Sequence, residues 1–174
     1  SAGVDNQTIT QFTHRLSEHL DYASESLKSQ KYRPRAIRRV WIPKSGSKEK
    51  RPLGIPTVLD RVIQTALRNV LEPIFERDFA EHSYGFRPQR GCKDALRRVD
   101  GLLKAGYNWV VDADLKRYFD MIPHEKLMDC VKEKVADSRI LDMIKMYLRQ
   151  EVLEEAGAWT PETGSPQGAV ISPL

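Results

Sequence analysis

Three aspartates lie close together in the stretch VVDADLKRYFDMI, which spans residues 110–122. Asp112 and Asp114 are separated by a single alanine and follow an apolar run, and Asp120 comes shortly afterwards. Because successive side chains of a β-strand point to opposite faces, Asp112 and Asp114 would share one face, with Cα atoms about 6.5 to 7 Å apart. Aspartate is depleted in strands, so two of them on one face need an explanation.

Metal binding is one explanation for this pair, and polar display on a solvated sheet face is the other. Magnesium prefers octahedral oxygen coordination and is commonly held by one or two carboxylates together with substrate phosphates. Two-metal phosphoryl transfer places its ions about 4 Å apart, so it draws carboxylates from more than one segment. The strand alone can therefore supply only part of such a site.

The elements that position these aspartates follow from the pattern around them. Over residues 109–115 the apolar side chains of Trp109, Val111, Ala113 and Leu115 alternate with Val110, Asp112 and Asp114, which predicts a strand. Pro123 favours the first turn of a helix, and Asp137 is expected to cap another. His124 has no second His or Cys at ligand spacing, so we expect it to be buried or to cap its helix. With a further strand predicted over 168–172, this half of the chain is expected to form an α+β lobe.

The N-terminal half begins with a helical pattern and a basic hairpin. Apolar residues at near-helical spacing predict one or two helices within residues 5–30. Residues 38–44 and 51–56 flank a Ser-Gly-Ser-Lys turn, which predicts a hairpin.

Two further helices are predicted before the aspartates. Thr57, with Asp60 three residues later, resembles a capping box, and an apolar stripe follows it. Pro73 should end or kink this helix, because it removes a backbone donor and clashes with the preceding turn. Residues 83–91 are loop-like, and residues 92–103 resume helical spacing.

The charge of the chain is concentrated in one window. The 28 Lys and Arg exceed the 24 Asp and Glu, which gives a net charge of +4. Residues 28–51 contain ten of the Lys and Arg against one Glu, a surplus of +9, so the remainder is slightly acidic. Such a window is typical of a surface that faces a polyanion, and a solvated charged face is the alternative.

Length and composition limit the class of protein. With 174 residues and 40% hydrophobic content, the chain can bury one core, or a core and a smaller lobe. Cys92 and Cys130 form no CxxC or Cys/His ligand pattern, and no signal-like segment or run of about 18 apolar residues occurs. We expect a cytoplasmic, reduced, soluble protein without structural zinc or a membrane partner. The apolar segment GSPQGAVISPL at the C-terminus suggests a chain cut from something longer.

Four segments of this chain, in order, resemble the group II intron reverse transcriptases, also called maturases. The segments are RRVWIPKSGSKEKRPLGIPTVLDRVIQ, EHSYGFRPQRGCKDAL, VVDADLKRYFDMIPHEKL and GSPQGAVISPL. They extend over roughly residues 35–174. A lone SPQG or DxD would carry little information, but the ordered set is specific.

The resemblance implies an α+β, right-hand polymerase. Residues 1–34 would form an N-terminal helical extension, residues 35–104 the fingers, and residues 105–174 the first part of a ferredoxin-like palm. Proteins of this family copy RNA into DNA and bind their intron RNA to assist splicing. The implied partners are intron RNA, an RNA template, a DNA primer and deoxynucleoside triphosphates, and the implied cofactor is Mg²⁺.

Carried over residue by residue, the resemblance makes Asp114 the catalytic, metal-binding aspartate, with the backbone carbonyl of Leu115 as a second ligand. Phe119 matches the aromatic residue that packs under the sugar of the incoming nucleotide and excludes a 2′-hydroxyl. An ordinary core Phe is the alternative for this position. Asp112 and Asp120 are assigned supporting roles.

The nucleotide-binding residues implied by the resemblance lie on the hairpin and near the C-terminus. Lys44 and Arg51, with Arg38, would hold the triphosphate, because fixed cations stabilise the charge that develops on a transferring phosphoryl group. Each of these cations also fits a solvated charge on the hairpin. Gln167 of SPQG matches a residue that contacts the incoming nucleotide and its templating partner.

Five further basic residues are assigned to template or RNA binding. The SYGFRPQR loop would contact the template through Arg87 and Arg90, and phosphate contacts of this kind are independent of sequence and sensitive to salt. Lys28, Lys31 and Arg33 belong to the basic window and are assigned to RNA binding.

The second catalytic motif of the family, a YADD-like segment with two further aspartates, does not occur, and no Asp follows Asp142. We therefore expect the chain alone to bind nucleic acid without polymerising. An unpaired palm strand would also favour a homodimer. The alternative functions are an RNA-binding splicing factor with vestigial polymerase residues, or a retron or CRISPR-associated reverse transcriptase.

Overall fold

The computed structural model describes residues 1–43, 46, 48–115, 117–165, 168 and 170–172. Its described strands form one four-stranded sheet in the order β2-β1-β3-β4. The strands are β1 (Ile37–Pro43), β2 (Lys50–Ile55), β3 (Val152–Glu154) and β4 (Gly157–Trp159). The helices are α1 (Ile9–His14), α2 (Leu16–Lys28), α3 (Val58–Phe75), α4 (Cys92–Lys104), α5 (Tyr118–Met121), α6 (His124–Lys132) and α7 (Ser138–Leu148). The predicted α+β class is confirmed.

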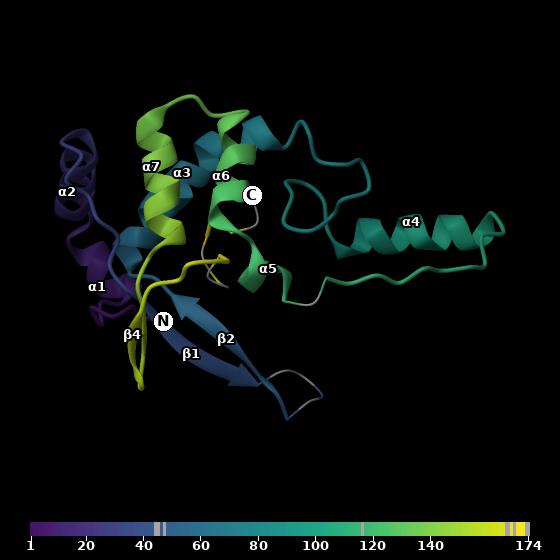
Figure 1. The fold of residues 1–174 in the computed structure, drawn as a ribbon, viewed down its shortest axis with the longest axis horizontal. Helices are drawn as coiled ribbons and strands as arrows, with labels where there is room; N and C mark the ends of the chain where they lie inside the picture. The colour runs from purple at the N-terminus through teal and green to yellow at the C-terminus, as the bar shows by residue number, and fades with distance from the viewer. Residues whose placement is uncertain (44–45, 47, 116, 166–167, 169, 173–174) are drawn as a thin grey trace.

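Two hairpins, joined by one parallel pairing, build the sheet (Figure 1). In the first hairpin β1 and β2 are antiparallel, as predicted for the basic segment. In the second, which the sequence analysis did not predict, β3 and β4 are antiparallel. Ile37 of β1 pairs with Val152 of β3 in parallel register, so the sheet joins the start of the basic hairpin to the region that precedes GSPQG.

Helix boundaries follow the predicted capping residues. Thr57 caps α3 and Asp137 caps α7, each through a side-chain oxygen that accepts backbone N–H groups of the first turn. Pro73 lies inside α3, which ends at Phe75, so this proline precedes the end of the helix by two residues. Pro123 immediately precedes α6.

The hydrophobic core lies among the helices, where α6 and α7 pack against each other and α3 passes next to them (Figure 1). Its buried apolar residues are Ala23, Tyr32, Ile63, Leu67, Leu71, Met128, Val131, Val135, Ile144, Tyr147 and Leu148. Each fully buried aliphatic side chain of this kind contributes roughly 1.5 to 3 kcal/mol to folding. The core therefore fixes the helices that support the sheet and its loops.

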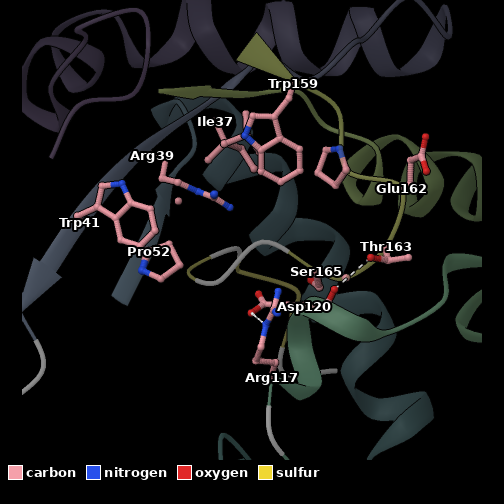
Figure 2. Close-up of a pocket in the computed structure, with 14 residues that line it drawn as sticks. Ile37, Arg39, Trp41, Pro52, Arg117, Asp120, Trp159, Glu162, Thr163 and Ser165 are labelled. Carbon is pink, nitrogen blue, oxygen red and sulfur yellow. Dashed lines mark hydrogen bonds and ion pairs between the residues drawn. The ribbon is translucent and has the colours of Figure 1, made fainter. Parts of the chain in front are cut away.

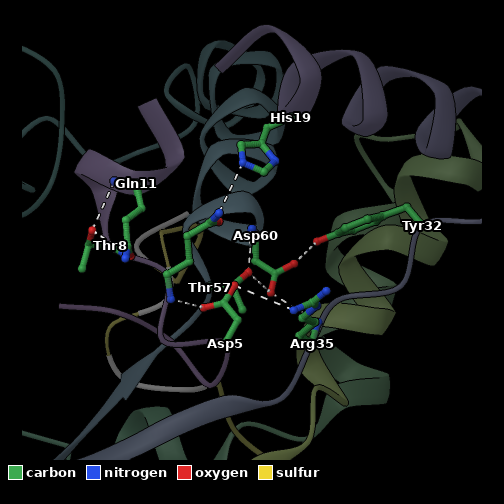
Figure 3. A network of polar contacts seen from close by, with 9 residues as sticks. Asp5, Thr8, Gln11, His19, Tyr32, Arg35, Thr57 and Asp60 are labelled. Carbon is green, nitrogen blue, oxygen red and sulfur yellow. Dashed lines mark hydrogen bonds and ion pairs between the residues drawn. The ribbon is translucent and has the colours of Figure 1, made fainter. Parts of the chain in front are cut away.

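A buried polar network fixes the chain where it enters β1 (Figure 3). The Tyr32 hydroxyl donates to Asp60 Oδ1 at 2.5 Å and lies 2.9 Å from the Tyr147 hydroxyl. Asp60 Oδ2 accepts from Thr57 Oγ1 at 2.8 Å and from the backbone N–H of Arg35 at 3.2 Å. Burial raises the pKa of Asp60, although these hydrogen bonds act in the opposite direction. The network ties the segment before β1 to α3 and α7.

α4 stands apart from the other helices (Figure 1). It has no buried residue, and Leu96, Val99 and Leu103 are exposed by 62%, 50% and 49%. Their spacing places these side chains on one face of the helix. Within the described part of the chain, α4 is an amphipathic helix whose apolar face is not covered.

The strand predicted over residues 109–115 is wrong for the described structure. No residue of this range belongs to a described strand, and the segment runs back from the end of α4 toward α5 (Figure 1). Trp109 and Val111 are exposed by 97% and 94%. A strand is stabilised by pairing its N–H and C=O groups with an adjacent strand, and none of the described strands adjoins this segment.

The strand predicted over residues 168–172 is also wrong for the described residues of that range. Residues 168 and 170–172 form turns. Gly168 has a φ of +102°, which a strand does not use, and the N–H of Val170 donates to the side chain of Gln64 at 2.9 Å instead of to a neighbouring strand.

No helix in the described part of the chain has both the length and the apolar character needed to cross a membrane. The two cysteines, Cys92 and Cys130, are both free and exposed.

Candidate functional site

The predicted catalytic aspartate and its neighbours line one surface cavity. Its volume is about 470 Å³. The lining residues are Ala113, Asp114, Leu115, Arg117, Tyr118 and Phe119. These residues come from one stretch of the chain, 113–119, and include the predicted metal ligand, the residue whose carbonyl is the predicted second ligand, and the predicted sugar-contacting aromatic residue. Asp114 itself is exposed.

Phe119 lies on α5, a single helical turn that directly follows the aspartate segment. Arg117 precedes this turn with a φ of +55°, in the left-handed region, and so redirects the chain. The Phe119 ring meets Tyr118 edge-on, with centroids 5.5 Å apart, and remains 42% exposed. The alternative of a buried core Phe is therefore wrong, and the ring is available at the cavity.

The first residues of the GSPQG segment dock onto this turn. The N–H of Gly164 donates to the Ile122 carbonyl, and the N–H of Ser165 donates to the Phe119 carbonyl, both at 2.8 Å. The buried imidazole of His124 lies 2.7 Å from the Gly164 carbonyl oxygen. The expectation that His124 is buried is confirmed. Four short polar contacts, including one from Thr163, thus fix the segment beside α5.

The residues that follow Gln167 contact β2 and α3. Gln167 itself lies outside the described residues. A Cβ atom added to Gly168 would stand 2.8 Å from the Gly54 carbonyl oxygen, so only glycine permits this approach. Gln64 of α3 is fully buried, and its Oε1 accepts the Val170 N–H at 2.9 Å. The two described flanks of Gln167 are therefore anchored on different elements.

Two of the three predicted triphosphate-binding cations share one face of the basic hairpin. Arg38 pairs with Ile55 and Arg51 pairs with Ile42 in the β1–β2 register, so both arginines fall on the same face. Arg51 is exposed. Arg38 is half-buried, and its Nη2 donates to the Ala2 carbonyl at 2.6 Å. Lys44 lies outside the described residues.

The three RNA-binding residues predicted at the start of the basic window are exposed. Lys28 ends α2, and Lys31 and Arg33 follow it. Arg33 Nη1 donates to the carbonyls of Gln30 and Tyr32, at 2.9 and 2.7 Å. These residues form a cationic surface at the end of α2.

The prediction for Arg87 requires correction, because this residue is buried. Its Nε and Nη2 donate to the Glu76 carboxylate, at distances between 2.7 and 3.1 Å. Its Nη1 donates to the carbonyls of Ala80 and Ser83 at 2.7 and 3.0 Å. The hydrogen bond from Arg87 lowers the pKa of Glu76. The guanidinium thus holds its own loop together and does not face a template.

The second arginine predicted for this loop is more accessible. Arg90 is half-buried, and its Nη1 donates to the Glu81 carbonyl.

The Asp114 carboxylate and the Leu115 carbonyl are suitable ligands for a hard cation, but two ligands do not complete its coordination sphere. A carboxylate and a backbone carbonyl are oxygen ligands of the kind that Mg²⁺ prefers. The described residues contain no group of three or more His, Cys, Asp or Glu that would hold a metal ion. Asp114 and the Leu115 carbonyl therefore fit part of the coordination sphere of such a cation.

Sequence reasoning missed the aromatic residues around Arg39. Trp41 and Trp159 come from different hairpins and approach the same guanidinium. A Glu-Ala-Gly turn between short apolar runs at 152–153 and 158–159 was the available signal for the second hairpin. The pairing of β1 with β3, however, brings together residues more than a hundred positions apart, and no local pattern predicts it.

Comparison with known proteins gives one family. The sequence profile described as "Reverse transcriptase (RNA-dependent DNA polymerase)" matches residues 42–174. Protein YkfC of Escherichia coli (strain K12) is 39% identical over 176 residues, which cover 99% of this chain and 46% of that protein. The group II intron-encoded protein LtrA of Lactococcus lactis subsp. cremoris is 41% identical over 172 residues, which cover 99% of this chain and 28% of that protein.

A solved structure also shares the fold. The chain superimposes on one in a partial Cas6-RT-Cas1–Cas2 complex with a TM-score of 0.62 and 23% identity, over 97% of this chain and 28% of that one. This chain spans less than half the length of the curated relatives named above.

Proposed function

Because this chain belongs to the reverse transcriptase (RNA-dependent DNA polymerase) family, we propose that the protein carrying it copies RNA into DNA by nucleotidyl transfer. We further propose that it is of the group II intron type and binds its own intron RNA to assist splicing. The partners are then intron RNA, an RNA template, a DNA primer and deoxynucleoside triphosphates.

The cavity shared by Asp114, Leu115 and Phe119 is the observation that supports this proposal. Reverse transcriptases generally use divalent metal ions, and we propose Mg²⁺ here. When bound, such an ion would stabilise the charge that develops on the transferring phosphoryl group. Asp114 and the Leu115 carbonyl would hold it, together with ligands beyond the described cluster.

The remaining residues position the nucleotide. The Phe119 ring would lie against the sugar, where a 2′-hydroxyl meets it sterically. Arg51 and Arg38 would orient the triphosphate from their shared hairpin face, because fixed cations are effective when they need no reorganisation during reaction. Lys44 would supply a further positive charge for the triphosphate. Gln167, between anchored flanks, would contact the paired base.

Primer extension on an RNA template tests this function in the full-length protein. Asp114→Asn should abolish Mg²⁺-dependent DNA synthesis, because the amide loses the anionic ligand. Asp142→Asn, at an exposed aspartate of α7 outside the cavity, is the matched control and should retain the activity. The 174-residue chain alone should bind RNA without extending a primer. Equal activity of Asp114→Asn and the unmodified protein would contradict the proposal.

A second candidate function is an RNA-binding splicing factor with vestigial polymerase residues. The exposed cations Lys28, Lys31 and Arg33 fit both functions. Filter binding distinguishes them when charge reversals at these three positions are compared with reversals at Lys44 and Arg51. A polymerase should lose primer–template binding with the second set, whereas a splicing factor should lose only structured intron RNA, and only with the first set.

A further inference from the structure

Two tryptophans hold the guanidinium of Arg39 between the two hairpins (Figure 2). The Arg39 guanidinium carbon lies 4.9 Å from the ring centroid of Trp159 and 6.0 Å from that of Trp41. Arg39 Nη1 also donates to Glu154 Oε1 at 2.8 Å. The two rings nevertheless remain 43% and 51% exposed. The indoles are therefore fixed in place with free surface on each.

The sheet register explains why this face is open. Arg39 is opposite Gly54, and Trp41 is opposite Pro52, so the β2 strand contributes no long side chain beside either residue. Val152 of β3 pairs with Trp159, which places the second indole next to the β1 face. A cavity of about 410 Å³ results, within the range of sites for small molecules.

The opposite wall of the cavity is polar (Figure 2). Arg117 and Asp120 face each other at 3.7 Å, and Thr163 Oγ1 donates to the Asp120 carbonyl at 3.1 Å. Glu162 and Ser165 also line this side. The cavity therefore combines aromatic faces on one wall with hydrogen-bond donors and acceptors on the other.

The charges of the cavity indicate what kind of group it suits. Among its described lining residues both arginines have a carboxylate partner, Arg39 with Glu154 and Arg117 with Asp120. A bare phosphate would meet no surplus positive charge. A flat, neutral ring with polar edge atoms fits better, because aromatic faces stack on any base.

Cations on the β1–β2 hairpin favour a base that is part of a nucleic-acid strand over the base of a free nucleotide. Lys50 is opposite Pro43, two residues along β1 from Trp41 and thus about 7 Å away. Lys50 and Lys48 are both exposed. In a nucleic-acid strand, the phosphates next to a base that stacks on Trp41 would lie close enough to interact with these two lysines.

We propose that this cavity binds an unpaired base of the RNA strand that the protein engages. The base stacks on the exposed indole surface of Trp41 or Trp159, and its edge faces the wall of Arg117, Asp120 and Thr163. This cavity borders the cavity of Asp114 and Phe119, and Arg117 lines both. The proposal rests on RNA binding as part of the proposed function.

Intrinsic fluorescence gives a direct test, since the chain has three tryptophans. Trp109→Phe removes the fully exposed one, so that the remaining signal comes from Trp41 and Trp159. A single-stranded oligoadenylate should quench this emission saturably. Trp159→Leu should weaken oligonucleotide binding roughly tenfold, while Trp159→Phe should retain it, because a phenyl ring still stacks. The thermal unfolding of both variants is recorded as a control for folding.

A second measurement does not depend on the variants. Photocrosslinking with an oligonucleotide that carries 5-iodouridine should give adducts on peptides containing Trp41 or Trp159. Crosslinks confined to other peptides would overturn the proposal. Saturable quenching by ATP at concentrations as low as those of the oligonucleotide would also overturn it, because the cavity would then be a site for free nucleotides.

Failure of this inference can be told apart from failure of the proposed function. Filter binding is measured on the same samples. RNA binding with neither quenching nor crosslinks at the tryptophans would refute only the stacking site. The absence of any RNA binding would refute the proposed function as well.

Discussion

Arg87 shows how the environment of one side chain decides its role. Its guanidinium is nearly fully buried and stands over the Phe79 ring, 5.4 Å from the centroid. It satisfies two loop carbonyls and the Glu76 carboxylate at once. The loop between α3 and α4 therefore depends on this residue for its conformation.

Replacing Arg87 with alanine should destabilise the protein. The Glu76 carboxylate and the carbonyls of Ala80 and Ser83 would lose the hydrogen bonds that Arg87 donates, at a cost of roughly 1 to 3 kcal/mol. Arg97→Ala is the control, because Arg97 is 75% exposed on α4 and should change stability by less than about 0.5 kcal/mol. Urea unfolding measures both. A stable Arg87→Ala variant with reduced RNA affinity would instead support the prediction that Arg87 contacts the template directly.

The contribution of Asp60 to the free energy of unfolding should fall as pH rises, which is opposite to the usual behaviour of a carboxyl group. Because burial raises its pKa above the ordinary value of 3.8, the folded state retains this proton to a higher pH than the unfolded state. The stability that the protonated carboxyl contributes is complete below 3.8 and is lost as pH rises through the folded-state pKa. Other carboxyls, such as Glu76, have lowered pKa values and act in the opposite sense.

The variant Asp60→Asn isolates this contribution. The difference in unfolding free energy, variant minus unmodified protein, should increase as pH rises above 3.8 and then become constant. Urea unfolding over a series of pH values measures it. A difference that does not change with pH would mean that Asp60 titrates normally in the folded state.

The residues of the site could be predicted from sequence only where a motif identifies them. Asp114, Leu115 and Phe119 were predicted from one contiguous segment, and the structure places them in one cavity. The burial of Arg87 was not predictable, because it depends on Glu76 eleven residues earlier and on the path of the loop between them. Arg39 was missed because its partners come from two separate hairpins.

At the level of elements, backbone hydrogen bonds dock the segment from Thr163 to Ser165 onto the helical turn α5. Gly164 makes this possible, because its φ is +83° and an added Cβ would lie 2.7 Å from the Phe119 carbonyl oxygen. A close backbone approach in the left-handed region requires glycine. The same contact sets the position of Phe119.

Gly164→Ala should therefore destabilise the protein, by roughly 1 to 3 kcal/mol. Gly101→Ala is a matched control on the exposed helix α4, where an added Cβ meets nothing within 4 Å. That substitution should stabilise by about 0.5 to 1 kcal/mol, because alanine is the better helix former. Thermal unfolding measures both. A shift of the same sign in both variants would argue against the docking of the segment on α5.

Helix ends that are set by nearby capping residues could be predicted from the sequence. Strands that depend on pairing with a segment far away in the sequence could not. The caps at Thr57 and Asp137 lie within the first turn of their helices, so local sequence was sufficient. The segment 109–115 has the alternation of a strand, but pairing is decided by neighbours that lie elsewhere in the fold. The β3–β4 hairpin is too short for its periodicity to be distinctive.

At the scale of the molecule, apolar surface is concentrated on α4 and the segment that follows it. Leu96 on the helix and Trp109, Val110 and Val111 on the extended segment are exposed by 62%, 97%, 79% and 94%. An exposed extended segment with uncovered apolar side chains is a template for pairing with another chain. We propose that the 174-residue chain self-associates there.

Val111→Asp should weaken this self-association roughly tenfold or more, because it places a charge in the paired surface. Val70→Asp is the control, since Val70 is 60% exposed on α3, away from this segment. Light scattering over a series of protein concentrations measures the association. A monomer at high concentration in the unmodified chain would contradict the proposal.

We propose that the segment from Asp114 to Phe119 selects and positions a deoxynucleotide in the full-length protein. The most direct test is the ratio of deoxynucleotide to ribonucleotide incorporation in primer extension on an RNA template. Phe119→Val should lower this ratio roughly ten- to hundredfold, because the smaller side chain admits a 2′-hydroxyl, while Phe119→Tyr should preserve it. An unchanged ratio in Phe119→Val, with DNA synthesis intact, would contradict this role of Phe119.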